Sequence, residues 1–172
     1  MAKCFLPLFF VFIAALLPAQ PLPSIAEKTE GMKAFPGFFT YYYEEAAGKI
    51  WLEVDRFGED FLYVNSLTGG LGSNDIGLDR NQLGDTRVVR FLEEGPRILL
   101  LEPNLKYRAN SENAQERRSV EEAFAQSVLW GFEAAAVEGS RVLIDWTPSL
   151  MRHAHGVTAR LKAHGAGAYK PD

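Results

Sequence analysis

The chain has 172 residues, with 18 basic and 22 acidic side chains and a net charge of −4. Nucleic-acid binding requires clustered basic side chains, which this composition does not offer, so we expect no nucleic-acid partner. The length is typical of one domain, and 47% of the residues are hydrophobic, enough to bury a core.

The first 19 residues have the three-part pattern of a secretory signal peptide. Lys3 is followed by an apolar run from Cys4 to Leu17, and Ala19 provides a small residue for cleavage. The alternative is a membrane anchor, but a spanning helix needs about 20 apolar residues, and this run is shorter and contains Pro7. We therefore expect an exported protein, periplasmic or extracellular, with no membrane span after cleavage. Because Cys4 is the only cysteine, the mature chain would have no disulfide and no thiolate ligand.

Residues 20–37 are predicted to be an irregular lead-in, because they contain Pro21, Pro23, Pro36 and Gly37. The remainder, 38–172, is expected to form a single β-rich domain. Alternating apolar residues and short turns predict strands at 38–43, 49–54, 61–67, 87–92 and 97–101.

In two of these strands, the distribution of apolar residues over the two faces indicates how the strand is placed in the sheet. In the second, Ile50, Leu52 and Val54 fall on one face, and Trp51 and Glu53 fall on the other. Residues 98–101 are apolar on both faces, which favours a central place in the sheet.

Two helices are predicted in the C-terminal half, separated by strands at 132–137 and 142–146. Ser119 and Glu122 form a capping box for the first helix, with Asn113 as an earlier alternative start and Gly131 as the end. The buried face of this helix would comprise Val120, Ala123, Phe124, Ser127 and Val128.

The last helix is predicted to begin with Thr147 as N-cap and Pro148 in the first position, and to end at Gly165. Its buried stripe would comprise Leu150, Ala154, Val157 and Leu161. Strands in succession followed by helices indicate an α+β fold built on a mainly antiparallel β meander.

The most unusual segment is the glycine-rich stretch 69–84. It lacks the Gly-Lys-Ser/Thr of a phosphate-binding loop and the ligand spacing of a helix–loop–helix calcium site. We interpret it as a structured turn or packing loop, and an ion or ligand site remains the alternative. The candidate loop or interface residues are Gly72, Asn74, Asp75, Asp79 and Arg80.

Catalytic and metal-binding residues are not predicted. His153 and His155 would point about 200° apart on one helix, so they would not share a zinc ion, and His164 suits the helix C-terminus. Adjacent carboxylates such as Glu44 and Glu45 are typical of solvated turns, and no serine lies in a G-x-S-x-G elbow. The aromatic strand at 38–43, with Trp51 opposite, is either core or a platform for a sugar or peptide.

Several blocks of the sequence resemble a known family. The most specific block is GGLGSNDIGLDRNQLGDTRVVRF at 69–91, and others lie at 103–109 and 116–132, with weaker likeness at 27–42 and 142–157. In these blocks the chain resembles the N-terminal domain of large secreted bacterial zinc-dependent metalloproteases. The resemblance implies a zincin-like peptidase domain further along the protein, with zinc held there by an H-E-x-x-H helix. This chain has no such motif, so no zinc ligand or catalytic residue is carried onto it.

Two functions follow as expectations. The first is a non-catalytic N-terminal domain, either whole or as a fragment, that packs on or positions a downstream peptidase domain of the same protein. The second is a free-standing periplasmic or extracellular binding module that uses the aromatic sheet face or the 69–84 loop.

Overall fold

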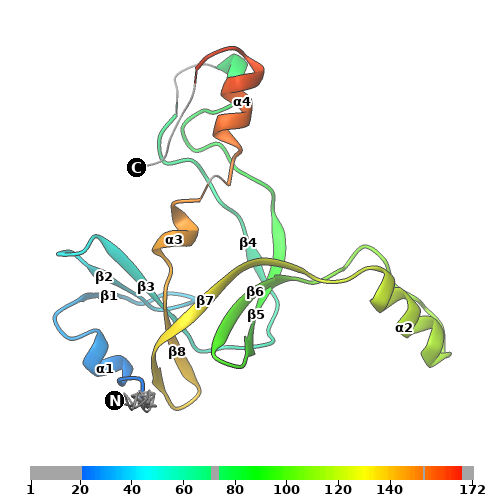
Figure 1. The fold of residues 1–172 in the computed structure, drawn as a ribbon, viewed down its shortest axis with the longest axis horizontal. Helices are drawn as coiled ribbons and strands as arrows, with labels where there is room; N and C mark the ends of the chain where they lie inside the picture. The colour runs from blue at the N-terminus through cyan, green and yellow to red at the C-terminus, as the bar shows by residue number, and fades with distance from the viewer. Residues whose placement is uncertain (1–20, 71–73, 153, 168–172) are drawn as a thin grey trace, which may run out of the picture.

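The computed structural model describes residues 21–70, 74–152 and 154–167, so the expected signal peptide lies outside the described residues. It confirms the α+β fold: an antiparallel sheet of eight strands with helices mainly in the C-terminal half (Figure 1). Among the described residues, no helix has both the length and the apolar character needed to cross a membrane.

The sheet is a curled meander into which the last hairpin is inserted. Its strands are β1 (Lys33–Phe35), β2 (Tyr41–Glu44), β3 (Lys49–Val54), β4 (Phe61–Tyr63), β5 (Arg87–Glu94), β6 (Arg97–Glu102), β7 (Ser127–Glu138) and β8 (Arg141–Asp145). Their order is β1-β2-β3-β8-β7-β6-β5-β4, and every neighbouring pair is antiparallel. As predicted, β6 is central, between β5 and β7.

Strand β7 produces much of the curl. Its first half pairs with β6 and its second half with β8, and the register shifts once along each partner. Such irregularities bend a strand and increase its twist. The curl brings Phe39, just before β2, within 5.2 Å of Phe61 in β4, measured between ring centroids.

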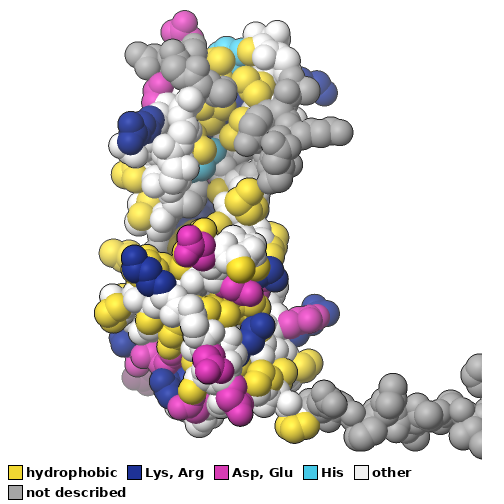
Figure 2. Space-filling model, turned by 90° about the vertical axis from the view of Figure 1, so that its left-hand side faces the viewer, with side chains coloured by type: hydrophobic (Ala, Val, Ile, Leu, Met, Phe, Trp, Pro, Cys, Tyr) yellow, Lys and Arg dark blue, Asp and Glu magenta, His cyan; other side chains and the backbone are white. Residues whose placement is uncertain are grey.

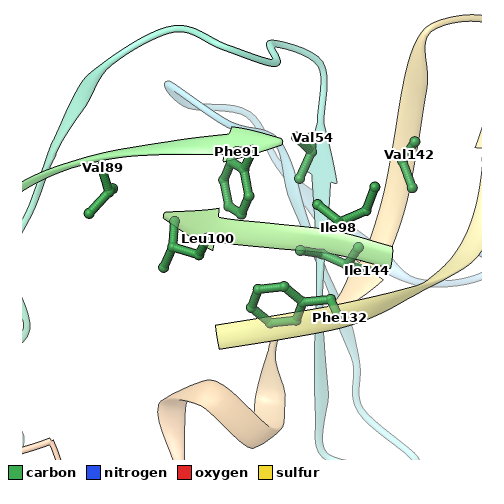
Figure 3. Close-up of a cluster of buried hydrophobic side chains, with 8 residues drawn as sticks. All are labelled: Val54, Val89, Phe91, Ile98, Leu100, Phe132, Val142 and Ile144. Atoms are coloured by element: carbon green, nitrogen blue, oxygen red, sulfur yellow. The ribbon is translucent and has the colours of Figure 1, made fainter. Parts of the chain in front are cut away.

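The main core lies inside the curl. Figure 3 shows its eight buried side chains converging: Val54, Val89, Phe91, Ile98, Leu100, Phe132, Val142 and Ile144. Phe91 is at the centre, with ring centroids 5.5 Å from Phe39, 5.6 Å from Phe61 and 5.9 Å from Trp146. These aromatic contacts join the two edges of the curled sheet through one buried ring.

The opposite face of the sheet carries a second, smaller core. Trp51, Ala136 and Leu143 pack there with Ile25 of the short helix α1 (Ile25–Lys28). The alternation predicted for β3 is therefore confirmed, and each of its two faces meets a different core.

The segment 20–37, which we expected to be irregular, contains both α1 and β1. Two local features explain the difference. Ser24 and Glu27 form a capping box that starts α1, and Phe35 of β1 stacks on Tyr41 with centroids 4.7 Å apart.

The first long helix begins at the alternative start, Asn113, and its predicted end at Gly131 is wrong. Helix α2 spans Ala114–Ala123, with Asn113 rather than Ser119 as its N-cap. Ser127 and Val128, expected on the helix, instead begin β7 and pair with Glu102 and Leu101. Hydrogen bonding to the central strand outweighs the helical pattern at this point.

The last helix is also divided in two. Helix α3 spans Thr147–Leu150 and helix α4 spans Val157–Ala163, and Gly156 before α4 has a φ of +61°, which interrupts a continuous helix. Thr147 does not cap α3, because its hydroxyl accepts a hydrogen bond from the Ile50 N–H at 2.9 Å. Of the predicted buried stripe, Leu150 is exposed and Leu161 is buried. Gly165 follows the end of α4, as predicted.

Candidate functional site

A two-stranded ribbon rises from the sheet at β4 and β5 and carries a small lobe at its end (Figure 1). We define the ribbon as residues 61–67 and 82–89. The ladder expected over 61–67 ends at Tyr63, but the pairing continues through a bridge between Ser66 and Leu83. Gly84 N–H donates to the Asn65 carbonyl at 2.7 Å, and Leu67 N–H donates to the Gln82 carbonyl at 3.1 Å.

One face of the ribbon is apolar and exposed. Along 61–68 the side chains alternate strictly between half-buried and exposed, as on an extended strand. The exposed positions include Leu62 at 76% and Val64 at 48%, and Leu83 at 64% lies on the same face because it is paired with Ser66. Outward positions on an antiparallel strand are usually polar, so we call these three side chains the outer ribbon face and treat them as a candidate interface.

The inner face of the ribbon is polar and attached to the segment after α3. The Tyr63 hydroxyl oxygen accepts a hydrogen bond from Arg152 Nη2 at 2.8 Å, and Asn65 Nδ2 lies 2.8 Å from His155 Nε2. A hollow of about 260 Å³ lies beside these contacts and includes Asp85 and Arg87 in its lining. These contacts attach the inner face of the ribbon to the segment after α3, and the outer ribbon face is left exposed.

The lobe consists of residues 68–81 and helix α4. A short 3₁₀ helix, η1 (Asn74–Ile76), leads to Gly77, whose carbonyl accepts a hydrogen bond from Arg160 Nη1 at 2.7 Å. Leu78 and Leu161, one from each segment, are buried. A Cβ atom added at Gly70 would lie 2.4 Å from the Arg80 backbone nitrogen, so glycine is required for this close approach. In the described parts of 69–84, which are residues 69–70 and 74–84, these contacts agree with the packed turn that the sequence predicts.

The candidate residues of the glycine-rich segment lie around this turn. Gly72 is outside the described residues, and Asn74 begins η1. Asp75 and Arg80 are exposed, whereas Asp79 is half-buried and its carbonyl accepts from Gln82 N–H at 3.0 Å. Within the described ranges, no group of three or more His, Cys, Asp and Glu is arranged to hold a metal ion.

The histidines are not arranged on one helix, as the sequence argument assumed. His153 lies outside the described residues, His155 occupies a turn before α4, and His164 is the C-cap of α4. The helical spacing argument therefore does not apply to His155, whose ring instead pairs with Asn65.

Trp51 does not belong to an exposed aromatic platform. It is buried, its Nε1–H donates to Glu44 Oε2 at 2.8 Å, and Lys28 Nζ lies 4.5 Å from its ring centroid. Phe38, Tyr41 and Tyr43 are exposed, so part of the aromatic strand remains accessible.

The sequence did not predict a groove along residues 103–109, bordered by α2 on one part and by the start of β5 and the segment 124–127 on the other, which we call the α2 groove. It consists of two adjoining hollows of about 520 and 290 Å³, both lined by Pro103, Asn104, Leu105, Tyr107 and Phe124. Phe124 was expected on a buried helix face, yet its ring is 40% exposed. No signal in the sequence distinguishes a buried Phe124 from an exposed one, because its burial depends on whether another element covers α2.

Comparison with known families gives two matches that divide the chain at the glycine-rich turn. Residues 81–171, more than half of the chain, match the family described as domain of unknown function (DUF5117), and residues 22–70 match domain of unknown function (DUF5118). No curated protein and no solved structure matches the chain. The two matched segments are joined in one sheet, because β3 pairs with β8 and β4 pairs with β5.

Proposed function

We propose that this chain, which belongs to the DUF5117 family, is the non-catalytic N-terminal domain of an exported zinc-dependent metallopeptidase. In this proposal it packs against a catalytic domain further along the same protein and positions it. The resemblance of residues 69–91 to such proteases supports the class of protein, and the outer ribbon face supports the docking role.

The observation that carries the proposal is the exposure of Leu62, Val64 and Leu83 on one side of the ribbon. Burying a leucine or valine side chain contributes about 1.5–3 kcal/mol, so a domain that covered these three would gain a substantial part of an interface. The ribbon needs no rearrangement for this, because its inner face is already held by Arg152 and His155.

Export and zinc belong to the same proposal. The signal pattern of residues 1–19 would direct the precursor out of the cytoplasm. The downstream domain would hold zinc through its own H-E-x-x-H motif, and no residue of this chain is assigned to the metal. Reading the gene beyond the codon for Asp172 is the first test: an open frame that reaches H-E-x-x-H supports the proposal, and a stop codon counts against it.

The second test is a double substitution, Leu62→Ser with Leu83→Ser, in the whole peptidase and in the isolated chain. We expect peptidase activity to fall about tenfold, because the lost apolar contacts weaken docking by the corresponding 1.4 kcal/mol or more. The melting temperature of the isolated chain should stay nearly unchanged, since both side chains are exposed there.

The matched control is Leu22→Ser, which removes an exposed leucine that precedes α1. It should leave activity unchanged. Full activity in the ribbon variant would contradict the docking role. A large loss of stability in the isolated chain would instead show that the ribbon leucines serve packing within this domain.

A free-standing binding module is the second candidate function, favoured by the exposed edge of the aromatic strand. Phe35 and Tyr41 stack with ring planes 6° apart, and Tyr41 and its neighbour Tyr43 are both exposed. Such a surface suits a sugar ring or a peptide. A stop codon directly after Asp172 would favour this candidate.

A further inference from the structure

Helix α2 extends away from the sheet, at the end of the connection between β6 and β7 (Figure 1). It has ten residues, and none of its side chains is buried. Its stabilising contacts are local: the Asn113 cap and an ion pair between Arg118 and Glu122. Helices of this length are marginal in water without tertiary packing, so covering one face of α2 would stabilise it.

An aromatic pair forms the floor of the α2 groove. The rings of Tyr107 and Phe124 stack with centroids 4.0 Å apart and planes 16° apart, and they remain 46% and 40% exposed. Asn104 holds Tyr107 in place: its Oδ1 accepts from the Lys106 and Tyr107 N–H groups, and its Nδ2 donates to the Tyr107 carbonyl. The apolar floor is therefore formed before any partner binds.

The size and shape of the α2 groove suit an extended segment of polypeptide. The hollows of about 520 and 290 Å³ are both lined by the aromatic pair, and both are open to solvent. Pockets for small ligands measure about 300–1,000 Å³, so together the two hollows have room for several side chains of a bound segment. Leu105, also exposed, lines both hollows and extends the apolar surface between them.

The rim of the α2 groove is positively charged, although the whole chain has a net charge of −4. Two of its five basic residues are neutralised: Arg87 pairs with Glu102 and Asp85, and Arg90 pairs with Asp60. Within the described ranges, Lys106, Arg108 and Arg117 pair with no carboxylate, and Glu121 is the only unpaired acidic residue in the lining.

We propose that the α2 groove binds an extended acidic segment of a partner protein. An aliphatic or aromatic side chain of that segment would lie against Tyr107 and Phe124, and its carboxylates would face Lys106, Arg108 and Arg117. The apolar floor supplies affinity and the unpaired cations select the charge of the segment. This surface is separate from the outer ribbon face, so the inference does not depend on the proposed peptidase role.

The test is a selection of random peptides, displayed on phage, against the chain, followed by affinity measurements on synthetic copies of the enriched peptides. We expect enriched sequences to combine Asp or Glu with a large apolar residue. The variant Lys106→Glu with Arg108→Glu should bind these peptides about tenfold or more weakly. Both side chains are exposed and make no side-chain hydrogen bond or ion pair within the described ranges, and Lys106 Nζ lies 5.6 Å from the Tyr107 ring centroid, so the fold should survive the change.

The matched control reverses two exposed charges outside the α2 groove, Arg97→Glu with Lys162→Glu, and should leave the affinity unchanged. Three outcomes would overturn the proposal. They are the enrichment of no peptide, the enrichment of peptides without acidic residues, and equal affinity for wild type and the Lys106/Arg108 variant. A dimer of the chain that the same variant dissociates would also overturn it, because a second copy would then be the occupant.

Discussion

Eight buried side chains from five strands meet inside the curled sheet, whereas the described part of the lobe buries one leucine from each of its two segments. The sheet core also contains interlocking aromatic rings, with Phe91 in contact with rings from three other parts of the chain. The lobe depends on close backbone approach at Gly70 and on the bond between Arg160 and Gly77. The sheet is therefore stabilised by apolar burial, and the lobe by a few specific contacts.

The difference has a functional meaning. On the face drawn in Figure 2, charged side chains are more frequent over the sheet than over the lobe, and apolar side chains are visible on both. Regions with few buried contacts open at a lower free energy than the core, and a partner that binds their closed form stabilises them. A lobe that is only moderately stable on its own, above a ribbon with an apolar face, is suited to contact with another domain.

The largest effect is expected for Phe91→Ala, which removes the ring at the centre of the main core. Phenylalanine-to-alanine changes at buried sites cost about 3–5 kcal/mol, and this ring is fully buried. Urea denaturation should show a loss of that size. Phe38→Ala, at an exposed ring in contact with Phe39 and Phe61, is the control and should cost much less. Equal losses in the two variants would show that the sheet is not organised around Phe91.

A smaller and more local effect is expected for Leu161→Ala in α4. The change leaves a cavity at one of the two buried lobe positions, at a cost of about 2 kcal/mol. Hydrogen exchange should show faster exchange of lobe amides with little change in β5, β6 and β8. Leu150→Ala, at an exposed leucine of α3, is the control. A matching loss of protection throughout the sheet would show that lobe and sheet unfold as one unit.

The sequence was most informative where a pattern is local and repeated. The predicted strand 49–54 coincides with β3, and the apolar run 98–101 lies in the central strand β6. The prediction was least informative where a tertiary contact competes with a local signal. Ser127 and Val128 fit a helix by spacing, but pairing with β6 places them in β7. Thr147 has the residue type of an N-cap, yet its hydroxyl is used by Ile50 on a neighbouring strand.

The outer ribbon face and the α2 groove could likewise be predicted from the sequence only in part. The alternation of 61–67 places Leu62 and Val64 on one face, and this much can be predicted. Which face points to solvent depends on Arg152 and His155, about ninety residues away, which hold the inner face. The α2 groove is harder still, because Phe124 is exposed only since no element of the described chain covers α2. Spacing predicts faces, and only the assembled fold determines what covers them.

The smallest effect is expected from removing a polar contact on the second face of the sheet. Tyr42 O–H donates to Glu53 Oε2 at 2.7 Å, and Glu53 Oε1 accepts from Arg141 Nη1 at 2.7 Å. Burial, followed by the hydrogen bond to Glu53, raises the pKa of Tyr42 from 10.0 to about 12. The folded protein therefore holds this proton more tightly than the unfolded chain does. The stability gained is fully present below pH 10 and is lost as the pH rises toward 12.

Tyr42→Phe should cost about 1 kcal/mol at neutral pH, the usual contribution of one hydrogen bond, and should make urea stability less sensitive to pH in the alkaline range. Tyr43→Phe, which removes a hydroxyl from an exposed residue of the same strand, is the control and should keep the wild-type pH dependence. Because the bond lies on the sheet and not in the lobe, protection against hydrogen exchange at alkaline pH should weaken in β2 and β3 before any change specific to α4. An unchanged alkaline profile in Tyr42→Phe would mean that Glu53 is held by Arg141 alone and that the second face contributes through apolar packing of Trp51 and Leu143.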